Sequence, residues 1–152
     1  MPGTLFFPFL LVLIGVIAVI YGGVNLRKAM RSKGWPGAKG RILSSEVRAV
    51  QWSRGIEYRP QIHYVYFVDN DSYTSSRISF SDFDYANNTR QDVAQKVVSR
   101  YPVGAAVDVY YDPGDPGNSV LENGVKMAVF VPIILGIVFS LVGVALGIAL
   151  SS

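Results

Sequence analysis

Hydrophobic residues are concentrated at the two ends of the chain, and polar residues fill the middle. Residues 1–26 and residues 127–152 contain no Asp, Glu, Lys, Arg or His, and consist mainly of Leu, Ile, Val, Phe, Ala and Gly. An α-helix needs about 20 apolar residues to cross the ~30 Å hydrocarbon core of a bilayer. The pattern therefore predicts one transmembrane helix in residues 1–26 and another in residues 125–150.

The first apolar segment could alternatively be a secretory signal peptide. Such a peptide carries positive charge ahead of its apolar stretch and a small-residue cleavage site behind it. Here the chain starts with Met, Pro, Gly and Thr, and the positive charge follows the apolar stretch. We therefore expect the first helix to be a retained anchor.

Polar and apolar residues alternate in the middle of the chain, as they do in half-buried strands. In residues 58–68, for example, Ile62, Tyr64 and Tyr66 fall on one face. Apolar residues at helical spacing occur between about 88 and 101, where Pro102 ends the pattern. The expected strands are residues 41–50, 58–68, 72–80, 107–111 and 119–122.

The element order is therefore β-β-β-α-β-β over residues 41–122. Five short strands with one helix favour a small, partly open β-barrel-like domain. The predicted fold class is a membrane α+β protein, in which two transmembrane helices flank this β-rich soluble domain. Residues 27–40 are expected to form a basic juxtamembrane connector.

The net charge of +3 is small, but the charge is unevenly distributed. Residues 27–48 contain seven basic side chains and a single acidic one, Glu46. Basic residues close to the ends of membrane spans stay on the cytoplasmic side. We therefore expect a multi-pass protein of the cytoplasmic (inner) membrane, with its central domain in the cytoplasm and both termini outside.

The same basic segment predicts contact with the membrane surface. A Trp ring suits the headgroup zone because it is half apolar and half polar, and each basic residue near anionic lipid contributes about 1 kcal/mol. The charges could instead serve only to fix the topology, and the two roles are compatible. Anionic headgroups are expected near residues 27–41, and the candidate membrane-surface residues are Arg27, Lys28, Arg31, Lys33 and Trp35.

Small residues recur at helical spacing in both apolar segments. Such stripes let helices approach closely in lipid, although glycine is also simply common in membrane helices. We expect a packed interface, either between the two helices of one chain or with a second copy, so that the protein could form a homo-oligomer. The candidate helix-packing residues are Gly15, Ala18, Gly22, Gly136, Ser140, Gly143 and Gly147.

The sequence contains little that suggests catalysis. It has no cysteine, and His63 is its only histidine, without a metal-ligand set beside it. Residues 112–118 have the composition of a calcium loop but not its alternating ligand spacing. We therefore expect no catalytic, metal or cofactor site and no enzyme activity. Nucleic acid is not an expected partner, because the basic residues lie beside an apolar helix while the strand region is near neutral.

Five short motifs are spread along the chain: Trp35-Pro36 followed by Gly40 and Ile42, Tyr64-Val65-Tyr66, Arg100-Tyr101-Pro102-Val103-Gly104, Val107-Asp108-Val109-Tyr110-Tyr111-Asp112-Pro113 and Val120-Leu121-Glu122. Together they resemble a widespread, mainly bacterial family of membrane proteins with a domain of unknown function between two transmembrane helices. The run of two tyrosines, aspartate and proline after R-Y-P-x-G is the most specific element of the resemblance. The resemblance covers almost the whole chain, and it offers no catalytic residues.

An ordered domain tethered at both ends, without evident chemistry, favours a binding role. The leading hypothesis is a non-enzymatic, membrane-anchored protein-binding or scaffolding module at the cytoplasmic face, with an unidentified protein partner. The alternative is an immunity-type or stress-protective membrane protein that neutralises a membrane-acting toxin. An adjacent toxin gene would favour the alternative.

Overall fold

The computed structural model describes residues 6–53, 55–80 and 90–151. The chain divides into two compact units, one made of Met1–Arg27 with Met127–Ser152 and the other of Lys28–Lys126. The first unit contains the two apolar ends, and the second contains the sheet domain.

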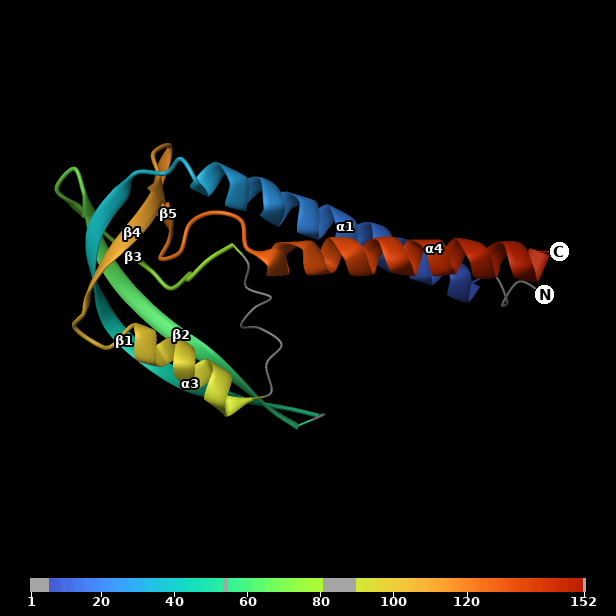
Figure 1. The fold of residues 1–152 in the computed structure, drawn as a ribbon, viewed down its shortest axis with the longest axis horizontal. Coiled ribbons are helices and arrows are strands. Elements are labelled where there is room, and N and C mark those ends of the chain that lie inside the picture. The colour runs from blue at the N-terminus through green and yellow to red at the C-terminus, as the bar shows by residue number, and fades with distance from the viewer. Residues whose placement is uncertain (1–5, 54, 81–89, 152) are drawn as a thin grey trace. The chain divides into compact units, whose positions relative to one another are not determined.

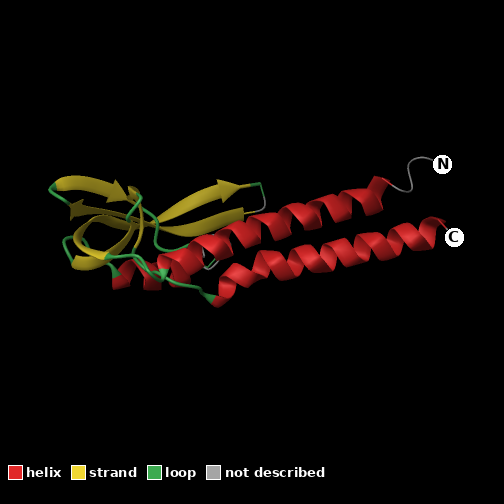
Figure 2. Cartoon of the chain, turned by 90° about the horizontal axis from the view of Figure 1, so that it is seen from above, coloured by secondary structure: helices red, strands yellow, loops and turns green. Residues whose placement is uncertain are grey.

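The first unit is a pair of antiparallel helices. It consists of α1 (Phe6–Ser32) up to Arg27, a short 3-10 helix η1 (Met127–Phe130) and α4 (Val131–Ser151). Figures 1 and 2 both show α1 and α4 side by side. Both helices are long and apolar enough to cross a membrane.

Helix α1 continues past Leu26, where the apolar segment ends, to Ser32. The charge change at Arg27 does not stop the helix, because Arg, Lys, Ala and Met all favour helical conformation. Arg31 in the last turn also interacts favourably with the helix dipole. The expected connector 27–40 is therefore mostly regular structure, and only residues 33–36 link α1 to the first strand.

The described part of the second unit contains a five-stranded antiparallel sheet and the helix α3 (Gln91–Arg100), besides the last residues of α1. The spatial strand order is β3-β2-β1-β4-β5. The predicted element order is confirmed, but the sheet is open and does not close into a barrel. The strands are β1 (Gly37–Trp52), β2 (Gly55–Val68), β3 (Asp71–Ser75), β4 (Ala106–Asp112) and β5 (Asp115–Val120).

Strand β1 is 16 residues long, and its two halves have different neighbours. Its first part, Gly37 to Arg41, pairs with β4, whereas its pairing with β2 begins at Gly40 and continues to Trp52. The pairing shifts between Ile42 and Ser44, which leaves Leu43 in a β-bulge. Beyond the bulge, residues 44–52 and 55–63 form a two-stranded extension, the hairpin arm. Helix α3 packs against both strands (Figure 1).

The turn between β2 and β3 consists of Asp69 and Asn70. Both residues have positive φ, 49° and 72° respectively. Two successive left-handed residues are typical of a two-residue hairpin turn whose twist matches that of the flanking strands, and Asp and Asn tolerate this conformation best after glycine.

The alternation in β2 predicts its buried face correctly. Ile62, Tyr64 and Tyr66 are almost completely buried, while His63 and Phe67 on the opposite face are exposed. The buried side chains form the main core together with residues from β1, β4, α3 and the segment after β5. The core is therefore on the concave side of the curled sheet.

Two tyrosine hydroxyls join β2 to β5 across this core, although β1 and β4 lie between these strands in the sheet. The Tyr64 hydroxyl donates to the Arg77 carbonyl oxygen at 2.9 Å and lies 3.1 Å from Ser119 Oγ. The Tyr66 hydroxyl donates to the Pro116 carbonyl oxygen. These bonds satisfy buried polar groups and also hold the sheet in its curled shape.

Glycine is required where β1 passes closest to its neighbours. A Cβ atom on Gly40 would lie 2.7 Å from the Val65 carbonyl oxygen and 2.8 Å from Val109 Cγ2. Gly37, three residues earlier, has space, because a Cβ there would meet nothing closer than Tyr110 Cε1 at 3.9 Å. The two positions form a matched pair for substitution.

We expect Gly40→Ala to destabilise the sheet domain by about 1–3 kcal/mol, because overpacking a core forces side chains and backbone to shift. For a domain of this size, that change lowers Tm by about 4 °C or more. Gly37→Ala is the control and should leave Tm nearly unchanged. Thermal unfolding of the purified protein, followed by near-UV circular dichroism, measures both. Equal Tm values for the two variants would contradict the close packing described at Gly40.

The two buried tyrosines also predict a pH dependence. Burial raises the pKa of the Tyr64 and Tyr66 phenols above the ordinary value of about 10. Because the folded-state pKa is the higher one, their contribution to stability is complete below pH ~10 and is lost as the pH rises through the folded-state values. An alkaline absorbance titration should show tyrosines that ionise only as the domain unfolds. Titration of all nine tyrosines at the ordinary pKa would contradict this expectation.

Candidate functional site

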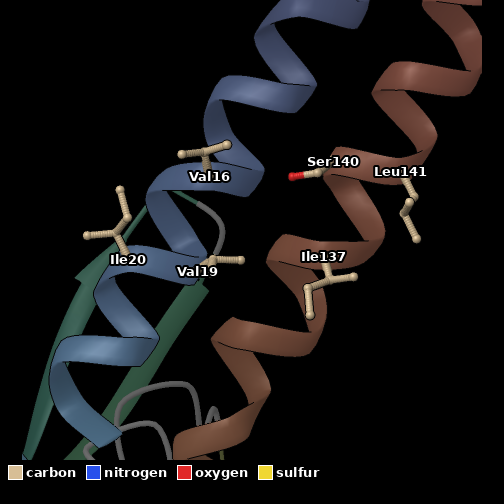
Figure 3. A pocket seen from close by; sticks show the side chains of 6 residues that line it. All are labelled: Val16, Val19, Ile20, Ile137, Ser140 and Leu141. Atoms are coloured by element: carbon tan, nitrogen blue, oxygen red, sulfur yellow. The ribbon is translucent and has the colours of Figure 1, made fainter. Parts of the chain in front are cut away.

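The small residues of the two apolar helices face each other. A Cβ atom on Gly15 would lie 2.5 Å from the Gly136 carbonyl oxygen and 2.3 Å from Ser140 Oγ. A Cβ on Gly136 would lie 2.5 Å from the Gly15 carbonyl oxygen, so the backbones touch at this crossing. Figure 3 shows the Ser140 side chain pointing from α4 towards α1. Such close approach is what small residues permit between helices in lipid.

The same interface extends to both sides of this crossing. A Cβ atom on Gly22 would lie 2.5 Å from Ile133 Cγ1, and one on Gly143 would lie 2.8 Å from the Pro8 carbonyl oxygen. Ala18 and Gly147 are half-buried and contribute less. The residues of the predicted stripes thus pack within one chain, and the homo-oligomer stays a prediction.

A shallow apolar groove lies beside the helix crossing. It is lined by Val16, Val19, Ile20, Ile137, Ser140 and Leu141 (Figure 3). The only polar side chain among them, Ser140, donates its hydroxyl to the Gly136 carbonyl oxygen at 2.9 Å. The groove is therefore lined by apolar side chains, apart from one hydroxyl that is already hydrogen-bonded within α4.

The four predicted basic residues are all exposed. Arg27, Lys28 and Arg31 lie on the last turns of α1, and Lys33 lies in the turn that follows. Because these side chains are exposed, they remain candidates for contact with lipid headgroups.

Trp35 also packs within the sheet domain. Its ring packs edge-to-face against Phe80, with centroids 5.5 Å apart. It covers a second, smaller core formed by Ala29, Phe80 and Val120. The position of this tryptophan is therefore explained by packing in the sheet domain, whether or not it also touches lipid.

A buried serine joins the two ends of the sheet domain. Ser32 is completely buried, and its hydroxyl donates to the Ala29 carbonyl oxygen at 2.8 Å. The Ser32 hydroxyl oxygen in turn accepts a hydrogen bond from the Gly124 amide at 3.0 Å. The segment that enters the domain and the segment that leaves it therefore lie together. Sequence analysis did not identify Ser32, because nothing in a pattern of basic residues marks one serine as buried.

The partly buried carboxylate of Glu122 forms a second cluster, close to the C-terminal end of the second unit. The Tyr101 hydroxyl donates to Glu122 Oε1 at 2.6 Å, Lys126 Nζ donates to Glu122 Oε2, and Arg100 Nη1 lies 3.6 Å from Oε1. The Glu122 amide also donates to the Ile78 carbonyl oxygen at 2.8 Å. The R-Y-P-x-G and V-L-E motifs thus meet, and they connect the end of α3 to the segment before η1.

The outer, convex face of the sheet carries scattered exposed groups. Phe67 is 61% exposed there, and Leu43 at the bulge is 50% exposed. His63 Nε2 lies 3.0 Å from Gln61 Nε2. Lys39 donates to Asp108 Oδ1 at 2.6 Å, and this hydrogen bond raises the pKa of Lys39.

The described part of the chain holds no group of three His, Cys, Asp or Glu side chains that could bind a metal ion. Within the run 112–118, only residues 113 and 114 form the turn between β4 and β5, and the Gly114 amide donates to Asp112 Oδ1 at 3.0 Å. The Asp112 carboxylate therefore serves this local turn, and β5 begins at Asp115, earlier than expected.

Comparison with known proteins places the sheet domain in a family. Residues 38–126 match a family described as a domain of unknown function (DUF3592). No curated protein matches the chain. The matched residues include all five strands except Gly37, together with α3, and make up more than half of the chain. The protein therefore belongs to the DUF3592 family, whose shared domain has no known function.

Proposed function

We propose that this protein is an integral membrane protein whose sheet domain is a non-enzymatic protein-binding or scaffolding module at the cytoplasmic face. The observation that carries the membrane assignment is the exposure of its apolar helices. The most apolar windows of the two helices have mean hydropathies of 2.5 and 2.8, yet only 17% and 11% of their residues are buried. Exposed apolar surface of this extent is unfavourable in water and favourable in lipid.

Neither the core helix of a soluble protein nor a cleaved signal peptide fits these helices as well as a membrane span does. A core helix would be mostly buried, which neither helix is. A cleaved signal peptide would be dispensable for the folded domain, but Ala29 and Ser32 at the end of α1 are completely buried within it. This burial supports a retained anchor.

The exposed basic residues support the proposed orientation. Arg27, Lys28, Arg31 and Lys33 follow the first apolar segment, and residues 127–152 carry no charge. Basic residues beside a membrane span favour the cytoplasmic side. Their exposure also allows contact with anionic headgroups, which contribute about 1 kcal/mol per basic residue near the surface.

A binding role for the sheet domain is supported by its outer face. Phe67 is largely exposed on β2, between the buried neighbours Tyr66 and Val68. The domain also holds its two ends together through Ser32 and Gly124, so a bound protein would be tethered to the membrane by two anchors. These features suit a rigid platform more than a reaction centre.

The orientation is tested by cysteine labelling, because the native chain contains no cysteine. In intact cells, Ser72→Cys on exposed β3 should resist a membrane-impermeant maleimide, whereas a cysteine added after Ser152 should react. Permeabilised cells provide the control, in which both positions should react. Labelling of Ser72→Cys from outside intact cells would reverse the proposed orientation.

The binding role is tested with a photo-crosslinking amino acid placed at adjacent positions of β2. A crosslinker at exposed Phe67 should capture a protein in native membranes, and the same group at buried Tyr66 should capture none, because the two residues face opposite sides of the sheet. The captured protein is identified by mass spectrometry after purification in mild detergent. Recovery of neither a protein partner nor a second copy, by crosslinking or by purification, would overturn the proposed function.

A further inference from the structure

One side of the hairpin arm is an unpaired strand edge. Strand β4 covers β1 only from Gly37 to Arg41, and then the loop before β4 exchanges two bonds with Ile42. The Ile42 amide donates to the Ala105 carbonyl oxygen at 3.0 Å, and the Gly104 amide donates to the Ile42 carbonyl oxygen at 2.9 Å. From Ser44 to Val50, no strand among the described residues pairs with β1 on this side.

The pairing of the arm shows which backbone groups face this edge. Val47 lies opposite Pro60, which has no amide hydrogen to donate. In an antiparallel pair, residues that exchange two hydrogen bonds alternate with residues that exchange none. Pro60 fits only the second kind, so the Val47 amide and carbonyl point away from β2. By the same alternation, Ser45 and Ala49 also direct their backbone groups to the free edge.

The other edge of the arm is protected, whereas this one is not. Pro60 lies in the middle of β2, and it removes the donor that a further strand would need on that side. Residues 44–52 of β1 contain neither proline nor lysine, which are common devices for blocking an edge. The two edges therefore differ in their capacity to accept another strand.

The charges on β1 are complementary to those of a second β1. If two copies pair antiparallel with Val47 opposite Val47, Glu46 of each copy lies opposite Arg48 of the other, twice across the two-fold axis. Within one chain, Arg48 lies opposite another cation, Arg59, which is already paired with Glu57 at 2.7 Å. Like charges directly opposite each other are unfavourable, and opposite charges are favourable. The second copy thus supplies the carboxylate that Arg48 lacks opposite it on β2.

We infer that the free edge of β1 is a dimerisation surface, which binds the same edge of a second copy by antiparallel strand pairing centred on Val47. Main-chain hydrogen bonds would supply the attraction, as in other cases of strand addition, and the Glu46–Arg48 pairs would fix the register. The inference rests on the proposed function only in treating the sheet domain as the binding part of the chain.

The register is tested by disulfide formation in native membranes. In the proposed pairing, Val47 lies opposite Val47, and the Cα separation of about 5.5 Å in such a pair suits a disulfide. Mild oxidation should therefore yield a covalent dimer from the Val47→Cys variant. Ala49→Cys is the matched control on the same edge; because Ala49 would lie opposite Ser45, it should yield little dimer. Equal crosslinking of the two variants, or none from either, would overturn the proposed register.

Charge reversal tests the same surface without a cysteine. Glu46→Arg places Arg opposite Arg48 twice and should weaken dimerisation on the order of tenfold, because two attractive pairs become repulsive. The double variant Glu46→Arg with Arg48→Glu restores opposite charges and should restore the dimer, which excludes misfolding as the cause. Failure of Glu46→Arg to weaken the dimer, or of the double variant to restore it, contradicts the inference. If the chain is monomeric but Phe67 still captures another protein, only the dimer is wrong; if neither crosslinking nor purification recovers any protein, the proposed function fails as well.

Discussion

The hydrogen bonds from the Tyr64 and Tyr66 hydroxyls to β5 hold together the parts of the sheet domain that its backbone pairing leaves apart. Strand β5 is the last in the sheet and pairs only with β4. The tyrosines bring it across the core to β2, and the chain that follows places Leu121 in the main core. The next residue, Glu122, then reaches Tyr101 at the end of α3. The position of the whole exit segment thus depends on how tightly the sheet curls.

Much of this architecture follows from periodicity in the sequence. The uncharged ends predict the two apolar helices, and alternation predicts which residues of β2 are buried. The element boundaries are predicted less well, because the residue where the sequence pattern changes is not the residue where the element ends. The charge at Arg27 marks the end of the apolar segment, but α1 continues to Ser32, shortly before Gly34 and Pro36. Similarly, β1 begins at Gly37, directly after that proline.

Contacts between residues that are far apart in the chain could not be predicted from the sequence. The glycine stripes predict which helix faces pack, but whether Gly15 meets Gly136 of the same chain depends on the antiparallel pairing of the helices. The hydroxyl partners of Tyr64 and Tyr66 depend on the curl of the sheet, which no local pattern encodes. The motifs that carry Tyr101 and Glu122 could be recognised separately, but only the fold shows that they form one cluster.

The hydrogen bond between Ser32 and Gly124 has a consequence for how such proteins could arise. It holds the entry and the exit of the sheet domain at one point, and adjacent ends are the property that lets a domain be inserted into another protein without distorting it. A helical hairpin needs only a short loop between its helices, and this domain occupies the position of that loop. Adjacent ends of this kind would also suit the domain to insertion between other pairs of helices.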